Sequence, residues 1–153
     1  MLKLEPHLVP KPLWKHSASE KLGRTSWQAI RQDRLREAGD RCEICREPSV
    51  RPLNCHEIWS YDDSNAVATL VGFEMHCAKC DLVTHMGRAI AHGYGDQALQ
   101  QMTGVNGINL AEAKQIWLSA KGIWKTRNAR EWSVKIPKTL VERYPRLRLL
   151  ERD

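Results

Sequence analysis

Two short stretches of the sequence, Cys42-Glu-Ile-Cys45 and Cys77-Ala-Lys-Cys80-Asp-Leu-Val-Thr-His85, decide the expected fold. In each stretch two residues separate a pair of cysteines, so both thiolates of the pair can face one ion. Two such pairs supply the four sulfur ligands that a structural Zn²⁺ prefers. The 31 residues between the pairs exceed the usual spacing of a zinc ribbon and leave room for a two-stranded hairpin. We therefore predict structural zinc; four cysteines that are buried or redox-active without a metal are the alternative.

The segments around these cysteines follow the order strand, turn, strand, helix. Residues 50–60 and 66–76 have the apolar character of short strands, and the polar residues 61–65 between them predict a turn. Residues 81–93 predict a helix that ends at a glycine. The sequence therefore predicts an α+β fold in which a zinc-stapled core of residues 40–93 is flanked by helices.

The flanks divide into three segments within a single domain of residues 1–153. Residues 1–24 carry three prolines near their start and predict an extended arm. Residues 25–39 predict a basic helix that ends at a glycine, and residues 94–153 predict a helical, basic C-terminal extension.

Two parts of the extension lead to separate expectations. A helix over residues 110–132 is expected to bury one apolar stripe, made of Leu110, Ala113, Ile116, Trp117, Ala120, Ile123 and Trp124. Residues 133–153 either pack back as a short strand and helix or form a partly ordered basic tail.

Length and composition place the chain among soluble globular proteins. Its 153 residues are 42% hydrophobic and 27% charged, which argues against a disordered or low-complexity chain. The longest apolar runs are far shorter than the ~20 residues that cross a bilayer, and the N-terminus lacks the apolar stretch of a signal peptide. We therefore expect a cytoplasmic protein with no membrane contact, in which thiols stay reduced.

The formal net charge of +6 is unevenly distributed along the chain. Residues 1–40 carry 8 basic and 5 acidic groups, residues 41–113 carry 5 and 9, and residues 114–153 carry 11 and 4. Basic flanks suit the phosphates of DNA or RNA, and an acidic centre suits metal cations. The alternative is that the charge only keeps the protein soluble and the basic helix face is simply solvated. The candidates for phosphate contacts are Arg31, Arg34, Lys125, Arg127 and Arg130.

Three side chains are candidates for a second, catalytic metal site. Asp81 and His85 are four residues apart in the predicted helix, so they share one face and can bind one cation. His56 ends the first predicted strand and can lie opposite them. A neutral histidine that removes a proton from water, beside a metal that neutralises developing charge, is sufficient for phosphodiester hydrolysis. The other histidines are expected to be structural or exposed, namely His7, His16, His76 and His92.

Cys55 is the fifth cysteine and stands directly before His56. Because neighbours in a strand point to opposite faces, the two are not expected to form a nucleophile–base pair. A lone cysteine in such a place is usually part of the packing.

These residues resemble the HNH (ββα-metal) endonuclease family in its four-cysteine, zinc-containing form. The resemblance covers about residues 40–90 and rests on the two cysteine pairs, on Cys55-His56-Glu57 and on Asp81 with His85; the chain is also similar to small bacterial and phage HNH proteins. It implies a metal-dependent endonuclease that hydrolyses DNA, with His56 as the general base. It also implies Mg²⁺ or Mn²⁺ at the strand–helix junction, held by Asp81 and His85 with Cys55 as a possible further ligand.

Three departures from the family pattern define the alternatives. The residue before the base is Cys55 rather than Asp, Glu or His, Asp81 replaces the histidine that usually follows the second cysteine pair, and the middle asparagine has its nearest counterpart in Asn65. A catalytically weak or inactive HNH-fold zinc module that binds nucleic acid or a protein partner is therefore the second hypothesis. A protein-interaction factor with tryptophan anchors is the third.

Overall fold

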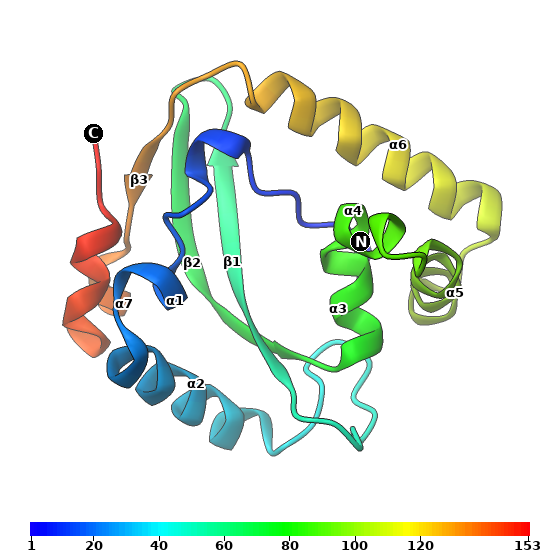
Figure 1. The fold of residues 1–153 in the computed structure, drawn as a ribbon, viewed down its shortest axis with the longest axis horizontal. Helices are drawn as coiled ribbons and strands as arrows, with labels where there is room; N and C mark the ends of the chain where they lie inside the picture. The colour runs from blue at the N-terminus through cyan, green and yellow to red at the C-terminus, as the bar shows by residue number, and fades with distance from the viewer.

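The computed structural model describes residues 1–153 and has an α+β architecture built on one three-stranded sheet. Strand β1 (Asn54–Asp62) pairs antiparallel with β2 (Val67–His76), and β3 (Ser133–Lys135) adds to the other edge of β2 in parallel. The hairpin of β1 and β2 runs through the middle of the molecule (Figure 1). On one side of it lie α2 (Arg24–Ala38), α7 (Lys138–Arg143) and the 3-10 helix η2 (Pro145–Leu150).

The other side of the hairpin carries two short helices, α3 (Ala78–Thr84) and α4 (Met86–Ala91), and two longer ones, α5 (Gly95–Asn106) and α6 (Leu110–Arg127). The helix expected over residues 81–93 begins earlier and is divided at His85, whose φ of −108° and ψ of 45° are not helical. Cys77 caps the start of α3, because its Sγ accepts a hydrogen bond from the Cys80 amide at 3.5 Å. The second cysteine pair is therefore built into the first turn of α3.

The hairpin forms close to where the sequence predicts it, but β1 begins at Asn54 rather than at residue 50 and continues to Asp62, into the segment expected to be the turn. Its register places Asn54 opposite His76 at the end nearest α3. At the other end the carboxylate of Asp62 accepts hydrogen bonds from the amides of Ser64 and Asn65 at 3.1 Å, which closes the turn. Asn65 therefore belongs to the turn, at the far end of the hairpin from His76.

Two hydrophobic clusters of 13 buried residues each stabilise the fold. The first joins α3, α4 and α5 to the cysteine turns and includes Leu4, Met75 and Met86. The second joins α2, the sheet and the C-terminal segment around Trp132. The hairpin contributes to both clusters, and Cys55 packs against both.

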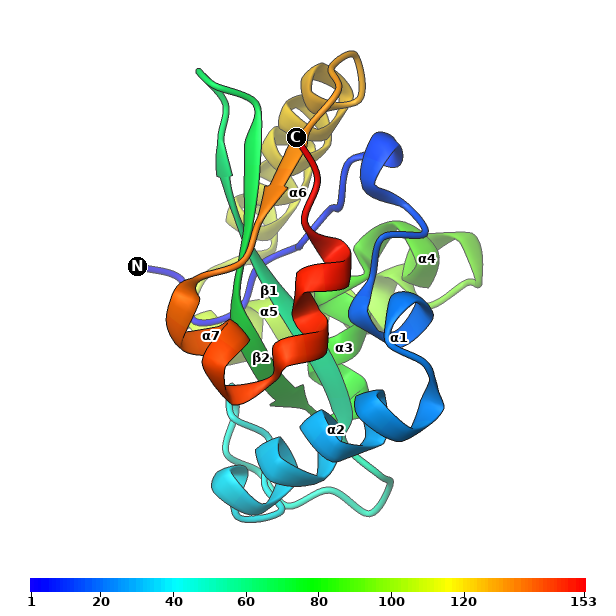
Figure 2. The same ribbon diagram turned by 90° about the vertical axis from the view of Figure 1, so that its left-hand side faces the viewer.

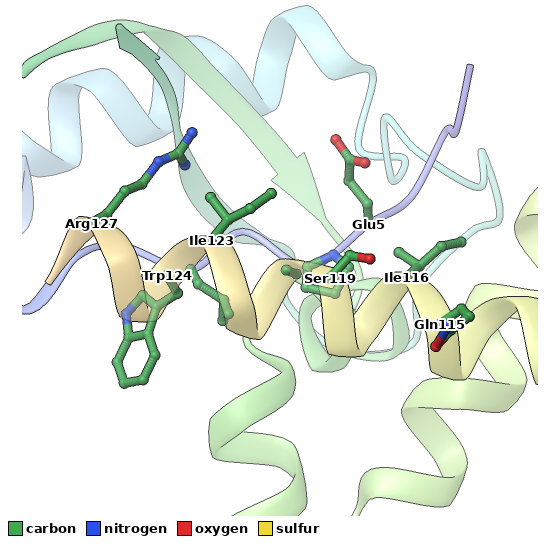
Figure 3. A pocket seen from close by; sticks show the side chains of 10 residues that line it. Glu5, Gln115, Ile116, Ser119, Ile123, Trp124 and Arg127 are labelled. Carbon is green, nitrogen blue, oxygen red and sulfur yellow. The ribbon is translucent and has the colours of Figure 1, made fainter. Parts of the chain in front are cut away.

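Helix α6 is packed less tightly than its pattern predicts. Only Ala113 is fully buried, and Leu110 and Ile123 are each 50% exposed, so the expectation of a buried stripe is wrong. The physical reason is that α5 and the first hydrophobic cluster cover only the N-terminal half of this helix, through Ala113, Ile116 and Trp117, and the narrow N-terminal arm covers part of the rest. A cavity of about 410 Å³ lies between α6 and arm residues Glu5, Pro6 and Leu8 (Figure 3).

The N-terminal arm is extended only over residues 1–10. A 3-10 helix η1 (Lys11–Leu13) and a short helix α1 (Ala18–Lys21) follow, which corrects the expectation of an extended segment to residue 24. Leu4 is buried, and its backbone amide and carbonyl both hydrogen-bond to the side chain of Asn106 in α5. The arm is thereby fixed across α5 before it reaches the hairpin.

The C-terminal segment packs back on the sheet as β3, α7 and η2, which is the first of the two alternatives for residues 133–153. Trp132 is buried, and its Nε1 donates to the carbonyl of Arg127 at 3.0 Å. Val134 pairs with Arg152, and η2 lies alongside α1 (Figure 2). None of the helices combines the length and the apolar character that a membrane span requires.

Candidate metal centres

The four cysteines of the two CxxC stretches converge between β2 and α3. The sulfur atoms of Cys42, Cys45, Cys77 and Cys80 all lie within 4.8 Å of one another, and none is in a disulfide. Their position is fixed by Glu43, whose amide donates to the Met75 carbonyl at 2.8 Å and whose carboxylate accepts from the Met75 amide at 2.7 Å. The first cysteine turn is therefore tied to the end of β2, next to the second.

This arrangement fits a tetrahedral Zn²⁺. Ligand sulfurs at about 2.3 Å from zinc are about 3.8 Å apart in a regular tetrahedron, and the sulfurs of Cys45 and Cys77 are 3.8 Å apart. The Nε2 of Gln101 also donates to the sulfur of Cys80 at 3.3 Å, a contact that favours the thiolate. The cluster can thus hold one metal ion with four sulfur ligands.

Three of these thiols, those of Cys42, Cys45 and Cys80, have shifted pKa values. A hydrogen bond from the Cys80 thiol, helped by backbone amides and opposed by burial, lowers the pKa of Cys42 to about 4. Burial raises the pKa of Cys45 to about 11, and the hydrogen bond to Cys42 together with burial raises the pKa of Cys80. A bound dication would hold all four as thiolates, so metal binding releases protons.

A second cluster of possible metal ligands forms on one face of the hairpin, at its end nearest α3. Ligand atoms of His56, His76 and Asp81 lie within 4.8 Å of one another. His56 is paired with Glu74 and Asn54 with His76, so residues 54, 56, 74 and 76 share one face of the two strands. Asp81 reaches this face from α3. The structure therefore brings together two of the predicted site residues and adds His76.

His76 has the features of an oriented metal ligand, which the sequence analysis did not predict. It is fully buried, and its Nε2 lies 2.7 Å from the carboxylate of Glu74. Its Nδ1 is buried without any hydrogen-bond partner. A carboxylate on one ring nitrogen fixes the tautomer and leaves the other nitrogen free to bind a metal. The donor set, two imidazoles and a carboxylate, suits a divalent cation.

His7 of the N-terminal arm completes the cluster from above His56. Its Nδ1 lies 2.9 Å from His56 Nε2, and the two rings are stacked. His56 also stacks on His76, and it is only 8% exposed. Burial and the neighbouring histidines lower the pKa of His56 to about 2 and that of His7 to about 4. Both rings are therefore neutral at physiological pH.

His85 occupies the open side of the cluster. Its Nδ1 lies 3.1 Å from Asp81 Oδ1, as their spacing predicts, and its ring meets that of His56 edge to face. Asp81 Oδ2 also accepts a hydrogen bond from Arg88 at 3.2 Å. Burial would raise the pKa of Asp81, but the hydrogen bond to His85 and the charge of Arg88 outweigh it and keep the pKa below its usual value.

Cys55 lies apart from both groups of ligand atoms. It packs between the two hydrophobic clusters, and burial raises the pKa of its thiol to about 12. The structure therefore does not bring Cys55 to the cation site beside Asp81. Asn65 is also remote, because its side chain bonds to Asp62 in the hairpin turn.

Four of the five predicted phosphate-binding residues make contacts inside the molecule. Arg31 donates to the Leu53 carbonyl, and Arg34 forms ion pairs with Glu37 and Glu43. Arg127 binds the carboxylate of Asp63 through two nitrogens at 2.8 Å, and Arg130 donates to the backbone carbonyl of the same residue. Lys125, which is exposed, is the one residue of the five with no side-chain hydrogen bond or ion pair, and Arg130 is exposed as well.

Comparisons with protein-family models, with curated proteins and with solved structures found no match to this chain.

Proposed function

We propose that this protein is a metal-dependent endonuclease that hydrolyses phosphodiester bonds in DNA, with a zinc-stapled ββα-metal core of the HNH type. The observation that carries the proposal is the convergence of three histidines and one aspartate where the hairpin meets α3, directly beside the four-cysteine cluster. Such a set can neutralise charge and accept a proton in one place, which phosphodiester hydrolysis requires.

Each cluster has its own role in this proposal. Cys42, Cys45, Cys77 and Cys80 would hold a structural Zn²⁺ that clamps the hairpin to α3. Asp81, with His76 and His85 as nitrogen donors, would hold the catalytic cation, Mg²⁺ or Mn²⁺. When bound, that cation supplies positive charge that stabilises the pentacoordinate phosphate and the leaving oxygen.

His56 is the proposed general base. Its ring lies within 4.8 Å of the carboxylate that would hold the cation. Burial lowers its pKa to about 2, so the ring is neutral but a weak base in this arrangement, and the role requires it to become more exposed. Its Nε2 is the atom that would take the proton, and His7 Nδ1 lies 2.9 Å from this atom. A substrate water would therefore have to take the place of His7, and movement of the arm is part of the proposal.

The same contact is the reason to keep a second candidate. With its Nε2 engaged and its ring almost fully buried, His56 is well placed to be structural. In this hypothesis the protein is an inactive zinc module that binds nucleic acid, DNA or RNA, or a protein partner. Salt-sensitive DNA binding with no cleavage under any divalent metal would select it.

Plasmid nicking with added Mg²⁺ or Mn²⁺ tests the proposal. His56→Ala and Asp81→Asn are expected to lower the nicking rate by about 100-fold or more, the usual contribution of a general base. His92→Ala is the matched control, because His92 is an exposed histidine outside the cluster. Glu74→Gln is expected to raise the required metal concentration about 10- to 100-fold, since it removes the group that orients His76. Equal nicking by wild type and His56→Ala would remove His56 from the mechanism.

A further inference from the structure

A second cavity, of about 660 Å³, lies on the side of α6 that faces α4. Its walls include the indoles of Trp14, Trp117 and Trp124 and the side chain of Ile90. Figure 3 shows that Trp124 and Ile123 point to opposite sides of α6, and Trp124 belongs to the lining of both cavities. The volume is within the range of about 300–1,000 Å³ that small-molecule sites occupy.

Two of the three indoles are held in place by a single backbone carbonyl. Trp14 Nε1 and Trp124 Nε1 both donate to the carbonyl of Val9, at 2.9 and 3.0 Å. Trp14 is nevertheless 54% exposed, so its ring is available for contact. The cavity is therefore an aromatic surface that is fixed before any ligand arrives, which lowers the entropy cost of binding.

The charges around this cavity have one sign. Arg88 and Lys121 belong to the lining, which contains no acidic residue, whereas the smaller cavity contains Glu5. The ammonium groups of Lys121 and Lys11 lie over the rings of Trp117 and Trp124, at 5.8 and 5.4 Å from the ring centroids. Aromatic faces beside cations suit a ligand that is flat and aromatic and also carries a negative charge.

The cavity is continuous with the second cluster. His7 and His85 belong to its lining, and Arg88 binds Asp81. A phosphate placed at Asp81 and His85 would thus leave its neighbouring nucleotide beside the indoles. This step rests on the proposed function, because it takes the cluster as the place of the scissile phosphate.

We infer that this cavity binds an unpaired nucleobase next to the phosphate held at the cluster, so that the preferred substrate is single-stranded or partly unpaired DNA. A base within a duplex is stacked and paired, and it can enter a cavity only when it is extruded or already single-stranded. Stacking on aromatic side chains beside cations is the common way in which proteins hold unpaired bases.

Fluorescence anisotropy tests this inference without added divalent metal, so that cleavage does not interfere. The probes are a labelled single-stranded oligothymidylate, an abasic oligonucleotide with the same number of phosphates, and the oligothymidylate annealed to its complement. The single strand is expected to bind about 5- to 150-fold more tightly than the abasic strand, the range that corresponds to the loss of one base–aromatic stack. Equal affinities for these two strands would overturn the inference.

Variants assign the effect to the cavity. Trp117→Ala is expected to abolish the preference for bases and Trp117→Phe to retain most of it. Because Trp117 also packs against a core cluster, Ile90→Glu is the second variant: it adds a repelling carboxylate at an exposed position of the lining. Lys121→Gln and Lys125→Gln each remove one charge from α6, but only Lys121 lines the cavity, so Lys121→Gln is expected to weaken binding more. Unchanged binding by both Trp117→Ala and Ile90→Glu would overturn the inference.

The two proposals fail separately. If the base preference is present and nicking is absent, the cavity stands and the nuclease proposal falls. If nicking depends on His56 while the abasic strand binds as well as the thymidylate, the nuclease proposal stands and the cavity proposal falls.

Discussion

Cys42 and Cys55 carry the same thiol in two different settings. Cys42 receives hydrogen bonds from Cys80 and from backbone amides that favour its thiolate, whereas Cys55 is held neutral by burial among apolar side chains. The difference comes from position, because successive residues of a strand point to opposite faces: Cys55 points away from the face that carries His56 and packs against the hydrophobic clusters.

Substitution of Cys42 is expected to lower the zinc content, whereas substitution of Cys55 is expected to leave it unchanged. The wild type should hold roughly one zinc per chain, and Cys42→Ser should lose most of it and melt at a lower temperature, since zinc binding contributes to folding. Cys55→Ala removes a sulfur that has no ligand role and should keep its zinc. Elemental analysis and thermal denaturation measure both effects. Equal zinc in the two variants would contradict the assignment of the four-cysteine site.

Single residues also show where sequence reasoning ends. The four cysteines and the Asp81–His85 pair were predictable because short, regular spacings bring them together. His76 was missed because its register could not be counted from the turn: the pairing that starts at Asp62 and Val67 shifts by one residue between Ile58 and Trp59, and only this shift places His76 opposite Asn54. His7 had no such signal, since 49 positions separate it from His56 and nothing local in the sequence joins them.

At the scale of elements, the N-terminal arm is hydrogen-bonded to α5, to α3 and to the end of α6. Asn106 at the end of α5 fixes its beginning, the carbonyl of Thr84 receives the amide of His7, and Asn128 after α6 receives the amide of Lys11. An extended chain has no internal hydrogen bonds, so these side chains and carbonyls satisfy its backbone groups.

Asn106→Ala is expected to loosen the start of the arm without unfolding the protein. Asn106 Oδ1 accepts from the amides of Lys3 and Leu4, and its Nδ2 donates to the Leu4 carbonyl. At about 1 kcal/mol for each hydrogen bond, hydrogen exchange of the Leu4 amide should become roughly ten-fold faster or more. Asn128→Ala is the control, because it frees only the amide of Lys11. Unchanged exchange at Leu4 in the Asn106 variant would show that the packing of its side chain alone holds the arm.

Helix α6 shows what a periodic pattern leaves open. Its apolar spacing correctly predicts a helix from Leu110, but a helical period says only that one side is apolar and not how much of that side is covered. The first half of α6 packs against α5, but the partner of its second half is a single extended segment of the N-terminal arm, which is too narrow to bury the stripe. The three-residue strand β3 was predictable only as one of two alternatives, because its pairing with β2 depends on long-range packing of Trp132.

At the scale of the whole molecule, the charge of +6 does not form a simple phosphate-binding face. Arg127 and Arg143 are paired with acidic residues that are distant in the sequence, and Arg34 joins α2 to Glu43 in the first cysteine turn, so part of the basic charge holds elements together. Composition gives the total charge, but it does not show which basic residues form ion pairs within the molecule, because that depends on the three-dimensional arrangement.

Stability is expected to fall as the pH falls below about 6.5. His7 and His56 have native pKa values of about 4 and about 2, below their value of 6.5 in the unfolded chain. Between these limits the unfolded state binds protons that the native state does not, so the free energy of unfolding decreases by up to about 1.4 kcal/mol per pH unit for each ring. Urea denaturation between pH 7.5 and pH 5 measures the slope.

His7→Gln is the variant that isolates this effect, because it removes one of the two histidines of the cluster whose pKa is lowered and leaves the four cysteines unchanged. Its stability should depend less steeply on pH than that of the wild type. Identical slopes would mean that other groups cause the loss of stability in acid.

The two hydrophobic clusters differ in whether they depend on the four-cysteine site. One incorporates the cysteine turns, whereas the other is assembled around the indole of Trp132 and contains none of the four cysteines. Removal of zinc by a chelator would therefore act on one half of the molecule. Helices α3 to α5 would lose their attachment to the cysteine turns, while the C-terminal segment would still pack against the hairpin. Such a half-folded species would keep a native scaffold on which the missing half could re-form as soon as metal returned.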